Sequence, residues 1–283
     1  MKLLLALLIL SLFSAGSFAA QVAAPVAVTA SVPALAPTPQ VTSASIIQKL
    51  KANGFNCKSQ PDGSICIISH VSAPRFKYSQ PVAIVVPANV VNPKTTQLYL
   101  HGFKGVCESA DSSAEFMVNE FGFLQQIRRE NSIMIYPMSS GKCETYNGLL
   151  VPQFSGFLTW LSQQIPMTKH WVIGGHSGAG RPIGYILAQN PIFTAKVDSV
   201  ILLDAAYGMP SHIGEWKTAS RINPKMDITS VYTGSGATAQ GSRMLKSSIQ
   251  PNLVIASPAT VQRHCLVPTK DYGYLLDKGL SRH

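Results

Sequence analysis

The sequence is poor in charge, and acidic residues are the scarcer kind. Only 13% of its 283 residues are charged, with 13 Asp and Glu against 23 Lys and Arg. So low a charged fraction excludes a coiled coil or a disordered polyelectrolyte, whereas 46% hydrophobic residues suffice for one large core. The basic residues are scattered and form no run interleaved with aromatics, so nucleic acid is not an expected partner. The positive excess instead favours weak attraction to the anionic polymers and lipids of a cell envelope.

Several other sequence patterns are also missing. Histidines and cysteines do not occur at the close paired spacing of a metal site, and there is no dinucleotide-binding fingerprint. We therefore expect neither a metal nor another cofactor. No apolar run reaches the length of an ordinary membrane span, so a stable span is not expected. No internal repeat is found, which disfavours a solenoid.

The first residues have the pattern of a secretory signal. Met1-Lys2 forms a short basic start, Leu3–Leu12 is apolar, and small residues lead to Ala19 and Ala20. This predicts a signal peptide over residues 1–20. Residues 21–42, rich in Ala, Pro, Val and Thr and without charge, predict an extended linker. One domain is expected over residues 43–283, in a protein that is secreted or periplasmic.

Five cysteines in an exported chain are candidates for disulfides. Cys57 and Cys66 flank a polar stretch with a Pro-Asp-Gly turn signal, which favours their pairing. Cys107 and Cys143 each follow a predicted strand end, so we expect them to meet across neighbouring loops. Cys265 is then left over, either as a small buried apolar residue or as a free thiol beside the site.

Short apolar strands alternate with helical segments along the rest of the chain. This order predicts an α/β fold with a mainly parallel central sheet and helices on both faces. The strands are expected at Pro81–Pro87, Gln97–Leu100, Ile133–Tyr136, Trp171–Ile173, Val197–Leu203, Ser230–Thr233 and Leu253–Ala256. The helices are expected at Ser43–Asn53, Ser113–Arg129, Phe154–Ile165, Arg181–Gln189 and Tyr272–Leu280.

A glycine-rich turn joins one of these strands to a helix. The residues Gly175-His176-Ser177-Gly178-Ala179 stand between the strand Trp171–Ile173 and the helix Arg181–Gln189. They resemble the G-x-S-x-G nucleophile elbow of the α/β-hydrolase superfamily, with Ala in place of the last Gly. The resemblance is to exported bacterial serine hydrolases and implies that Ser177 is the nucleophile. Two other interpretations are a phosphate-binding helix N-terminus and a trypsin-like serine motif.

The same resemblance implies an oxyanion hole. The strand at Gln97–Leu100 ends in His101-Gly102, as many α/β hydrolases have before their first crossover helix. The backbone N–H groups of Phe103 and Gly178 would then hold the oxyanion. His101 is expected to be a structural residue that forms hydrogen bonds.

The resemblance further implies the chain order nucleophile, acid, histidine. Three histidines follow Ser177: His212, His264 and the terminal His283. His212 is expected in a loop that could cap the site, because Gly and Pro surround it, and it is badly placed as the base because it follows no late strand. His264 follows the last predicted strand, where the fold delivers its base; the alternative is a loop histidine without a task.

The acid is chosen among four carboxylates. Asp198 and Asp227 precede their strands and so lie at the wrong end of the sheet, and Glu215 is expected in a loop. Asp204 follows Val197–Leu203 at the carboxyl end, one strand earlier than usual, and is our candidate. It is alternatively a cap of the following turn.

Three functions are consistent with these residues. The first is a serine esterase or lipase-like enzyme that cleaves an ester, or an amide, through an acyl-serine intermediate. The second is an amidase or peptidase that acts on cell-envelope material. The third is a noncatalytic binding protein with the same fold. The substrate is thus a small molecule or envelope component, with Lys104, Arg181 and Arg221 as basic residues that favour an anionic group or are solvated surface charges.

Overall fold

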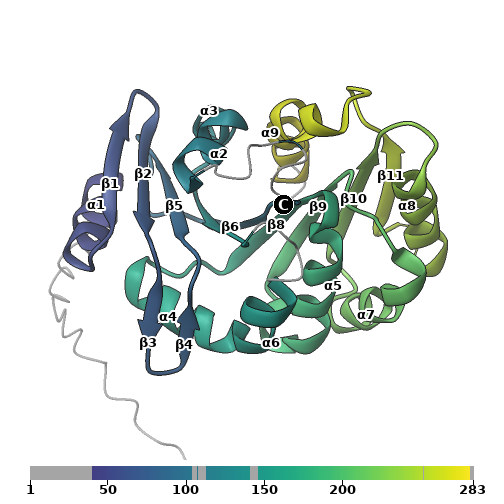
Figure 1. The fold of residues 1–283 in the computed structure, drawn as a ribbon, viewed down its shortest axis with the longest axis horizontal. Coiled ribbons are helices and arrows are strands. Elements are labelled where there is room, and N and C mark those ends of the chain that lie inside the picture. The colour runs from purple at the N-terminus through teal and green to yellow at the C-terminus, as the bar shows by residue number, and fades with distance from the viewer. Residues whose placement is uncertain (1–39, 104–106, 108–112, 141–145, 251, 281–283) are drawn as a thin grey trace, which may run out of the picture. The chain divides into compact units, whose positions relative to one another are not determined.

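The computed structural model describes residues 40–103, 107, 113–140, 146–250 and 252–280. The expected signal peptide, nearly all of the linker, Lys104, Cys143 and His283 lie outside these ranges. Within them, nine strands form one sheet in the order β1-β2-β5-β7-β6-β8-β9-β10-β11 (Figure 1). Along the chain they are β1 (Asn56–Gln60), β2 (Gly63–Ile68), β5 (Val82–Pro87), β6 (Thr95–Leu100), β7 (Ser132–Pro137), β8 (His170–His176), β9 (Val197–Leu203), β10 (Asp227–Tyr232) and β11 (Val254–Pro258).

The sheet is mainly parallel, as the sequence predicts. Six neighbouring strands, β7, β6, β8, β9, β10 and β11, run parallel to one another. The other three, β1, β2 and β5, form an antiparallel edge in which β5 pairs with β7. A short second sheet pairs β3 (Val71–Ala73) with β4 (Phe76–Tyr78). Parallel strands place their carboxyl ends at one edge, so loops that are distant in sequence meet there.

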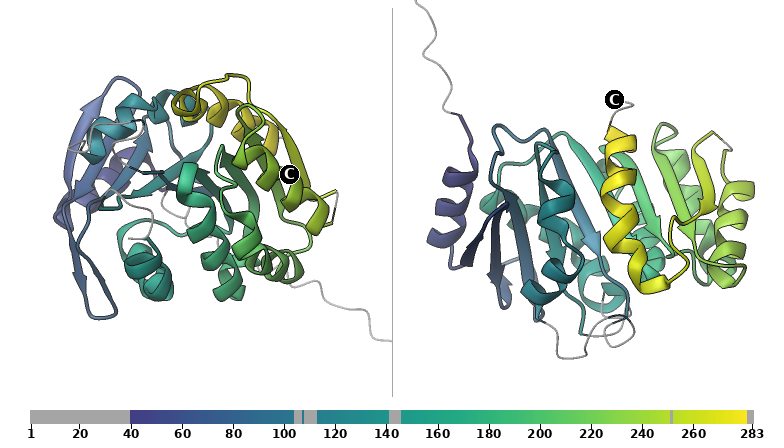
Figure 2. Two further views of the ribbon diagram at one scale, coloured as in Figure 1. Left: turned by 45° about the vertical axis from the view of Figure 1, so that its right-hand side comes forward. Right: turned by 90° about the horizontal axis from the view of Figure 1, so that it is seen from above.

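Helices cover both faces of the sheet. One face carries α2 (Ala114–Glu120), α3 (Phe123–Ile127) and α9 (Val267–Leu280), which lie above the sheet in Figure 1 and over it in the right-hand view of Figure 2. The other core contains residues of α1 (Ser43–Ala52), α4 (Phe154–Gln164), α5 (Gly180–Gln189), α6 (Pro191–Thr194), α7 (Met209–Ile222) and α8 (Ala237–Ser248). None of the helices in the described ranges is both long and apolar enough to span a membrane.

Each central strand supplies both cores because successive side chains point to opposite faces. In β9, Val200 and Leu202 join the core beneath α5 and α7, whereas Ile201 and Leu203 join the core beneath α9. This explains why the strand is an unbroken apolar run rather than an alternating one.

Two local expectations are wrong. The helix expected over Ser113–Arg129 is two helices, because Gly122 adopts a left-handed φ of 63° between them. The stretch around His212, including Glu215, is not a loop but part of α7, whose backbone has a kink at His212 (φ −140°, ψ 20°). Pro210 is accommodated in α7 because the first turn of a helix does not use its N–H donors. The turn expected at Pro61-Asp62-Gly63, by contrast, is confirmed, because it joins β1 and β2 in a hairpin that places Cys57 opposite Cys66.

Candidate active site

Ser177 lies at a sharp turn between β8 and α5. Its φ is 56°, a left-handed value that is strained for any residue with a side chain. The serine is also buried, with 6% of its surface exposed. A short 3-10 turn, Ser177–Ala179, then leads directly into the helix. Strand, strained serine and helix follow each other as the elbow motif requires.

Close backbone approaches explain the small residues around the serine. A Cβ on Gly175 would lie 2.4 Å from Cδ1 of Ile183 in α5, and a Cβ on Gly180 would lie 2.1 Å from the carbonyl oxygen of Ala205. Ala179, which departs from the motif, is fully buried in the core. The tight approach is made at Gly180 instead, one residue later than the motif's final glycine.

Asp204 and His264 meet at the carboxyl end of β9. His264 Nδ1 lies 2.7 Å from Oδ2 of Asp204, and the carboxylate also accepts hydrogen bonds from Thr233 N–H at 3.0 Å and from the Thr233 hydroxyl at 2.5 Å. Asp204 is 1% exposed, and its φ of 48° is a second left-handed value. Residues 60 positions apart are therefore joined by a short charge-assisted hydrogen bond.

The carboxylate of Asp204 is held ionised. Burial by itself raises its pKa, but hydrogen bonds from His264, Thr233 and Thr238 outweigh burial and lower the pKa from 3.8 to about 2. An ionised acceptor on the Nδ1 side fixes the proton of His264 on that nitrogen. The lone pair is then on Nε2, which is the tautomer that a general base needs.

His176, which immediately precedes Ser177, connects the serine to His264. Its Nε2–H donates to the carbonyl oxygen of His264 at 3.1 Å, and the two imidazole rings lie 4.4 Å apart between centroids. Burial, followed by the neighbouring His264, lowers the pKa of His176 to about 3, so its ring is neutral. The elbow and the loop that carries His264 are thereby held together next to the serine.

The end of β6 passes directly over the serine. A Cβ on Gly102 would lie 2.5 Å from Cβ and 3.1 Å from Oγ of Ser177. His101 is fully buried; its Nδ1 contacts the Gly102 carbonyl oxygen at 2.6 Å, and its Nε2 accepts the Ser139 N–H at 2.8 Å. His101 is thus a structural hydrogen-bonding residue, as expected.

The contacts of His101 also orient the next peptide. Because the peptide between Gly102 and Phe103 is planar and trans, its N–H points away from its carbonyl oxygen. Fixing the Gly102 carbonyl against the ring of His101 therefore fixes the direction of the Phe103 N–H.

The structure corrects the expected disulfides in part. Cys57 and Cys66 face each other across the hairpin of β1 and β2 and form a disulfide. Cys107, however, is bonded to Cys265 and not to Cys143, so Cys265 is not the leftover cysteine. This pairing could not be predicted from chain order because its two cysteines are 158 residues apart in the sequence. They meet because the carboxyl ends of the parallel strands lie at one edge of the sheet. It attaches the segment after β6 to the residue that follows His264.

Several residues around the Asp204–His264 pair were not predicted from the sequence. Thr233 and Thr238, which hydrogen-bond Asp204, come from the loop after β10 and the start of α8. Tyr207, 41% exposed, presents its ring edge-on 6.1 Å from the ring of His264. The only signal for any of them was that Thr233 is the last residue of the strand predicted at Ser230–Thr233. Their contacts depend on how β9, β10 and the last loop pack together.

The remaining basic and histidine candidates lie on helices. Arg181 begins α5 next to the elbow and stacks over the ring of Tyr185 at 5.5 Å, and Arg221 lies in the last turn of α7. His212 lies in α7, where its burial, followed by the nearby Arg181, lowers the pKa of its imidazole even though Glu215 acts in the opposite direction. Among these, only Arg181 is adjacent to the serine turn.

Comparison with known proteins supports the fold. No protein-family model and no curated protein matches the sequence. Solved structures do match, among them an S-formylglutathione hydrolase from Agrobacterium tumefaciens, with a TM-score of 0.55 and 11% identity over 80% of this chain and 98% of that one. A mutant of the rice cell wall degrading esterase LipA from Xanthomonas oryzae has a TM-score of 0.54 and 8% identity over 87% and 97% of the two chains. A predicted CIB-like hydrolase from Thermoplasma acidophilum has a TM-score of 0.51 and 12% identity over 81% and 100%.

These likenesses, with the strand order above, define an α/β-hydrolase fold, as the sequence predicts. Identities this low show the fold alone. A fold of this kind carries many different activities, so the reaction depends on the residues of this chain's own site.

Proposed function

We propose that this protein is a serine hydrolase that cleaves esters through an acyl-serine intermediate. The observation that carries the proposal is the 2.7 Å hydrogen bond between His264 Nδ1 and the ionised Asp204, located beside a serine with a left-handed φ. A buried acid that orients a histidine next to a strained serine is the arrangement by which a hydroxyl is activated as a nucleophile.

The reaction follows from the roles of these groups. His264 Nε2 accepts the hydroxyl proton as Ser177 Oγ attacks the ester carbonyl carbon, and Asp204 stabilises the imidazolium that forms. The Phe103 and Gly178 N–H groups hold the oxyanion of the tetrahedral intermediate. His264 then returns the proton to the departing alcohol, and a water molecule, activated in the same way, releases the acid and restores Ser177.

Exposed apolar side chains near His264 favour a substrate with an apolar portion. Tyr207 is 41% exposed beside the imidazole, and Leu266, two residues after His264, is 39% exposed. Exposed rings and aliphatic side chains around a polar catalytic group are typical of small-molecule sites. Small acyl esters and esterified envelope polymers are therefore the substrate classes to test first.

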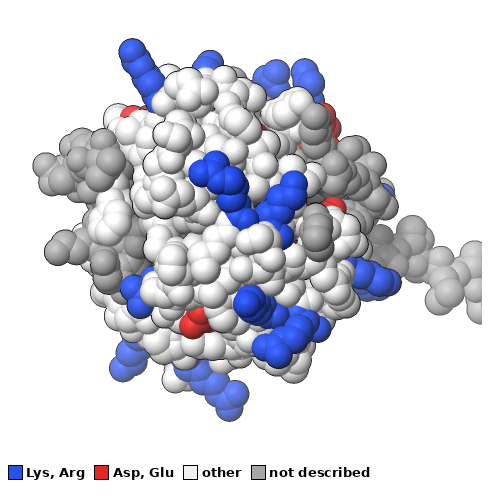
Figure 3. All heavy atoms as spheres, turned by 90° about the vertical axis from the view of Figure 1, so that its right-hand side faces the viewer, with Lys and Arg blue, Asp and Glu red and all other residues white. Residues whose placement is uncertain are grey.

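Export is part of the same proposal. The amino-terminal pattern of residues 1–20 and the two disulfides both suit an oxidising compartment outside the cytoplasm. The face that includes α7 and α8 carries scattered Lys and Arg with few acidic side chains (Figure 3), among them the exposed Lys217, Arg221, Lys225, Arg243 and Lys246. Such a face attracts the anionic polymers of a cell envelope.

A serine-directed fluorophosphonate tests the proposal. The probe should label the native chain and not Ser177→Ala, and p-nitrophenyl esters of short and long acyl chains should show a burst of nitrophenol under pre-steady-state conditions. Peptide and amide substrates run in parallel measure the competing amidase function. Absence of labelling, under conditions in which a control hydrolase reacts, would leave the noncatalytic binding protein as the correct interpretation.

A further inference from the structure

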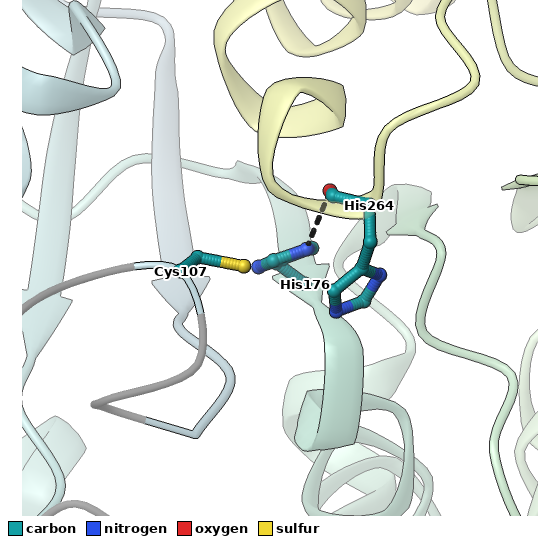
Figure 4. A group of neighbouring side chains, drawn as sticks. All are labelled: Cys107, His176 and His264. Atoms are coloured by element: carbon teal, nitrogen blue, oxygen red, sulfur yellow. Dashed lines mark hydrogen bonds between the residues drawn. The ribbon is translucent and has the colours of Figure 1, made fainter.

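Three side chains with metal-binding atoms meet beside Ser177. A ring nitrogen of His176, a ring nitrogen of His264 and the sulfur of Cys107 all lie within 4.8 Å of one another. They come from the end of β8, the segment before α9 and the segment after β6. Figure 4 shows the Cys107 sulfur directed at the His176 ring, on the side opposite the nitrogen that contacts the carbonyl of His264.

His176 already has the hydrogen bond that prepares an imidazole as a ligand. Its Nε2–H donates to the His264 carbonyl oxygen, which leaves a lone pair on Nδ1. This Nδ1 is buried, has no hydrogen-bond partner in the described structure, and the residue is 1% exposed. A buried acceptor without a donor destabilises the fold, and the proposed catalytic reaction gives this atom no role.

His264 has the corresponding arrangement on its other side. Its Nδ1–H donates to Asp204 at 2.7 Å, which leaves the lone pair on Nε2. A histidine whose second nitrogen donates to a carboxylate or a backbone carbonyl is the usual form of a metal-bound imidazole. Both imidazoles therefore have their supporting hydrogen bonds in place.

The third ligand is blocked in the oxidised chain because the Cys107 sulfur is bonded to Cys265. We propose that Cys107, His176 and His264 form a binding site for Zn²⁺ that becomes available when the Cys107–Cys265 disulfide is reduced. A thiolate with two imidazoles is a ligand set suited to Zn²⁺, and three protein ligands leave one position open.

The redox step balances with a dithiol as the reductant. The Cys107–Cys265 bond breaks and takes up two electrons and two protons, and the dithiol is oxidised to its own disulfide. Zn²⁺ then displaces the proton of the Cys107 thiol, which goes to solvent, and accepts the two nitrogen lone pairs. Neither imidazole has to lose a proton, because both already carry theirs on the nitrogen that faces away from the metal.

Metal binding has a consequence for activity that rests on the proposed function. The lone pair of His264 that would accept the serine proton becomes a metal ligand, so reduction together with Zn²⁺ should inhibit hydrolysis. Reduction without metal should leave more activity than reduction with it. The site would make the enzyme active in an oxidising compartment and inactive where thiols and zinc are both present.

Two cysteine variants provide a matched test, each in a Cys143→Ala background. Cys265→Ser and Cys107→Ser lose the same disulfide but keep opposite thiols, and neither needs a reductant that would open the Cys57–Cys66 bond. Without reductant, Cys265→Ser should bind Zn²⁺ in competition with a chromophoric chelator at least about 100-fold more tightly than Cys107→Ser. With Co²⁺, only Cys265→Ser should show a thiolate-to-cobalt charge-transfer band, and adding His264→Ala should abolish it. Equal affinities in the two cysteine variants, or no band in either, would overturn the site.

A second measurement uses the native chain in case a variant does not fold. After reduction by a dithiol and its removal under nitrogen, Zn²⁺ should slow alkylation of Cys107 by iodoacetamide at least about tenfold more than alkylation of Cys265, as mapped by mass spectrometry. Equal protection of both cysteines would count against the site. Neither measurement uses a substrate, so binding of zinc by a chain with no esterase activity would refute the proposed function and leave the metal site standing.

Discussion

Replacing Asp204 by Asn tests the acid directly. Asn keeps the shape of the side chain, and its carbonyl oxygen can still accept the Thr233 N–H. Its amide group, however, cannot accept from both the Thr233 hydroxyl and His264 Nδ1, as the second carboxylate oxygen does. His264 then loses the partner that selects its tautomer. We expect kcat to fall about 10³- to 10⁴-fold while KM for a p-nitrophenyl ester changes little.

The same variant should also lower stability in a pH-dependent way. The pKa of Asp204 falls from 3.8 to about 2 in the folded chain, which corresponds to about 2 kcal/mol at neutral pH. Since the folded pKa lies below the unfolded one, this contribution is present above pH 3.8 and disappears as the pH falls toward 2. Urea unfolding should therefore separate the native chain from Asp204→Asn at pH 7, and the difference should shrink at acidic pH.

Asp227→Asn is the matched control, because Asp227 begins β10 at the opposite, amino end of the sheet. It should retain kcat within about twofold, because substitutions distant from a site usually have small effects. Similar small losses in both variants would refute the assignment of Asp204. A large loss in Asp227→Asn alone would show that the carboxyl end of the sheet is not where the reaction occurs.

Three further outcomes are expected. Gly102→Ala should lower kcat by more than about tenfold, because the new Cβ would lie 2.5 Å from Cβ of Ser177. As its control, Gly214→Ala should leave activity unchanged and raise the thermal midpoint slightly, because a Cβ there would have no atom within 4 Å. His101→Phe should lower kcat about 10- to 100-fold at unchanged KM, because the Phe103 N–H loses its fixed direction and the oxyanion forms only during the reaction. A rise in KM by the same factor would contradict this role. Thr233→Val keeps the backbone donor but removes the hydroxyl, so the pKa of Asp204 should rise and kcat should fall about tenfold. If NMR titration finds the pKa of Asp204 unchanged, the hydroxyl is not what lowers it.

Much of the fold could be predicted from local sequence. The strand Val197–Leu203 is found at its predicted bounds, because a strand buried on both faces must be apolar throughout. The turn around Ser177 could also be recognised in the sequence from its glycines. Glycine is needed at Gly175, for example, because Ile183 leaves no room there for a side chain. The β1 and β2 hairpin was missed as secondary structure, because its edge strand is largely exposed and has little apolar patterning.

Sequence by itself determined which segments are strands, which serine stands at a strand-to-helix turn, and which carboxylate and histidine follow strand ends. It did so because these features depend on residues within one turn or one strand. Only the tertiary structure decided which distant loops meet. Cys107 pairs with Cys265 and Asp204 contacts His264 because strand order and the packing of α9 bring those loops to one edge of the sheet, and no local pattern encodes that arrangement.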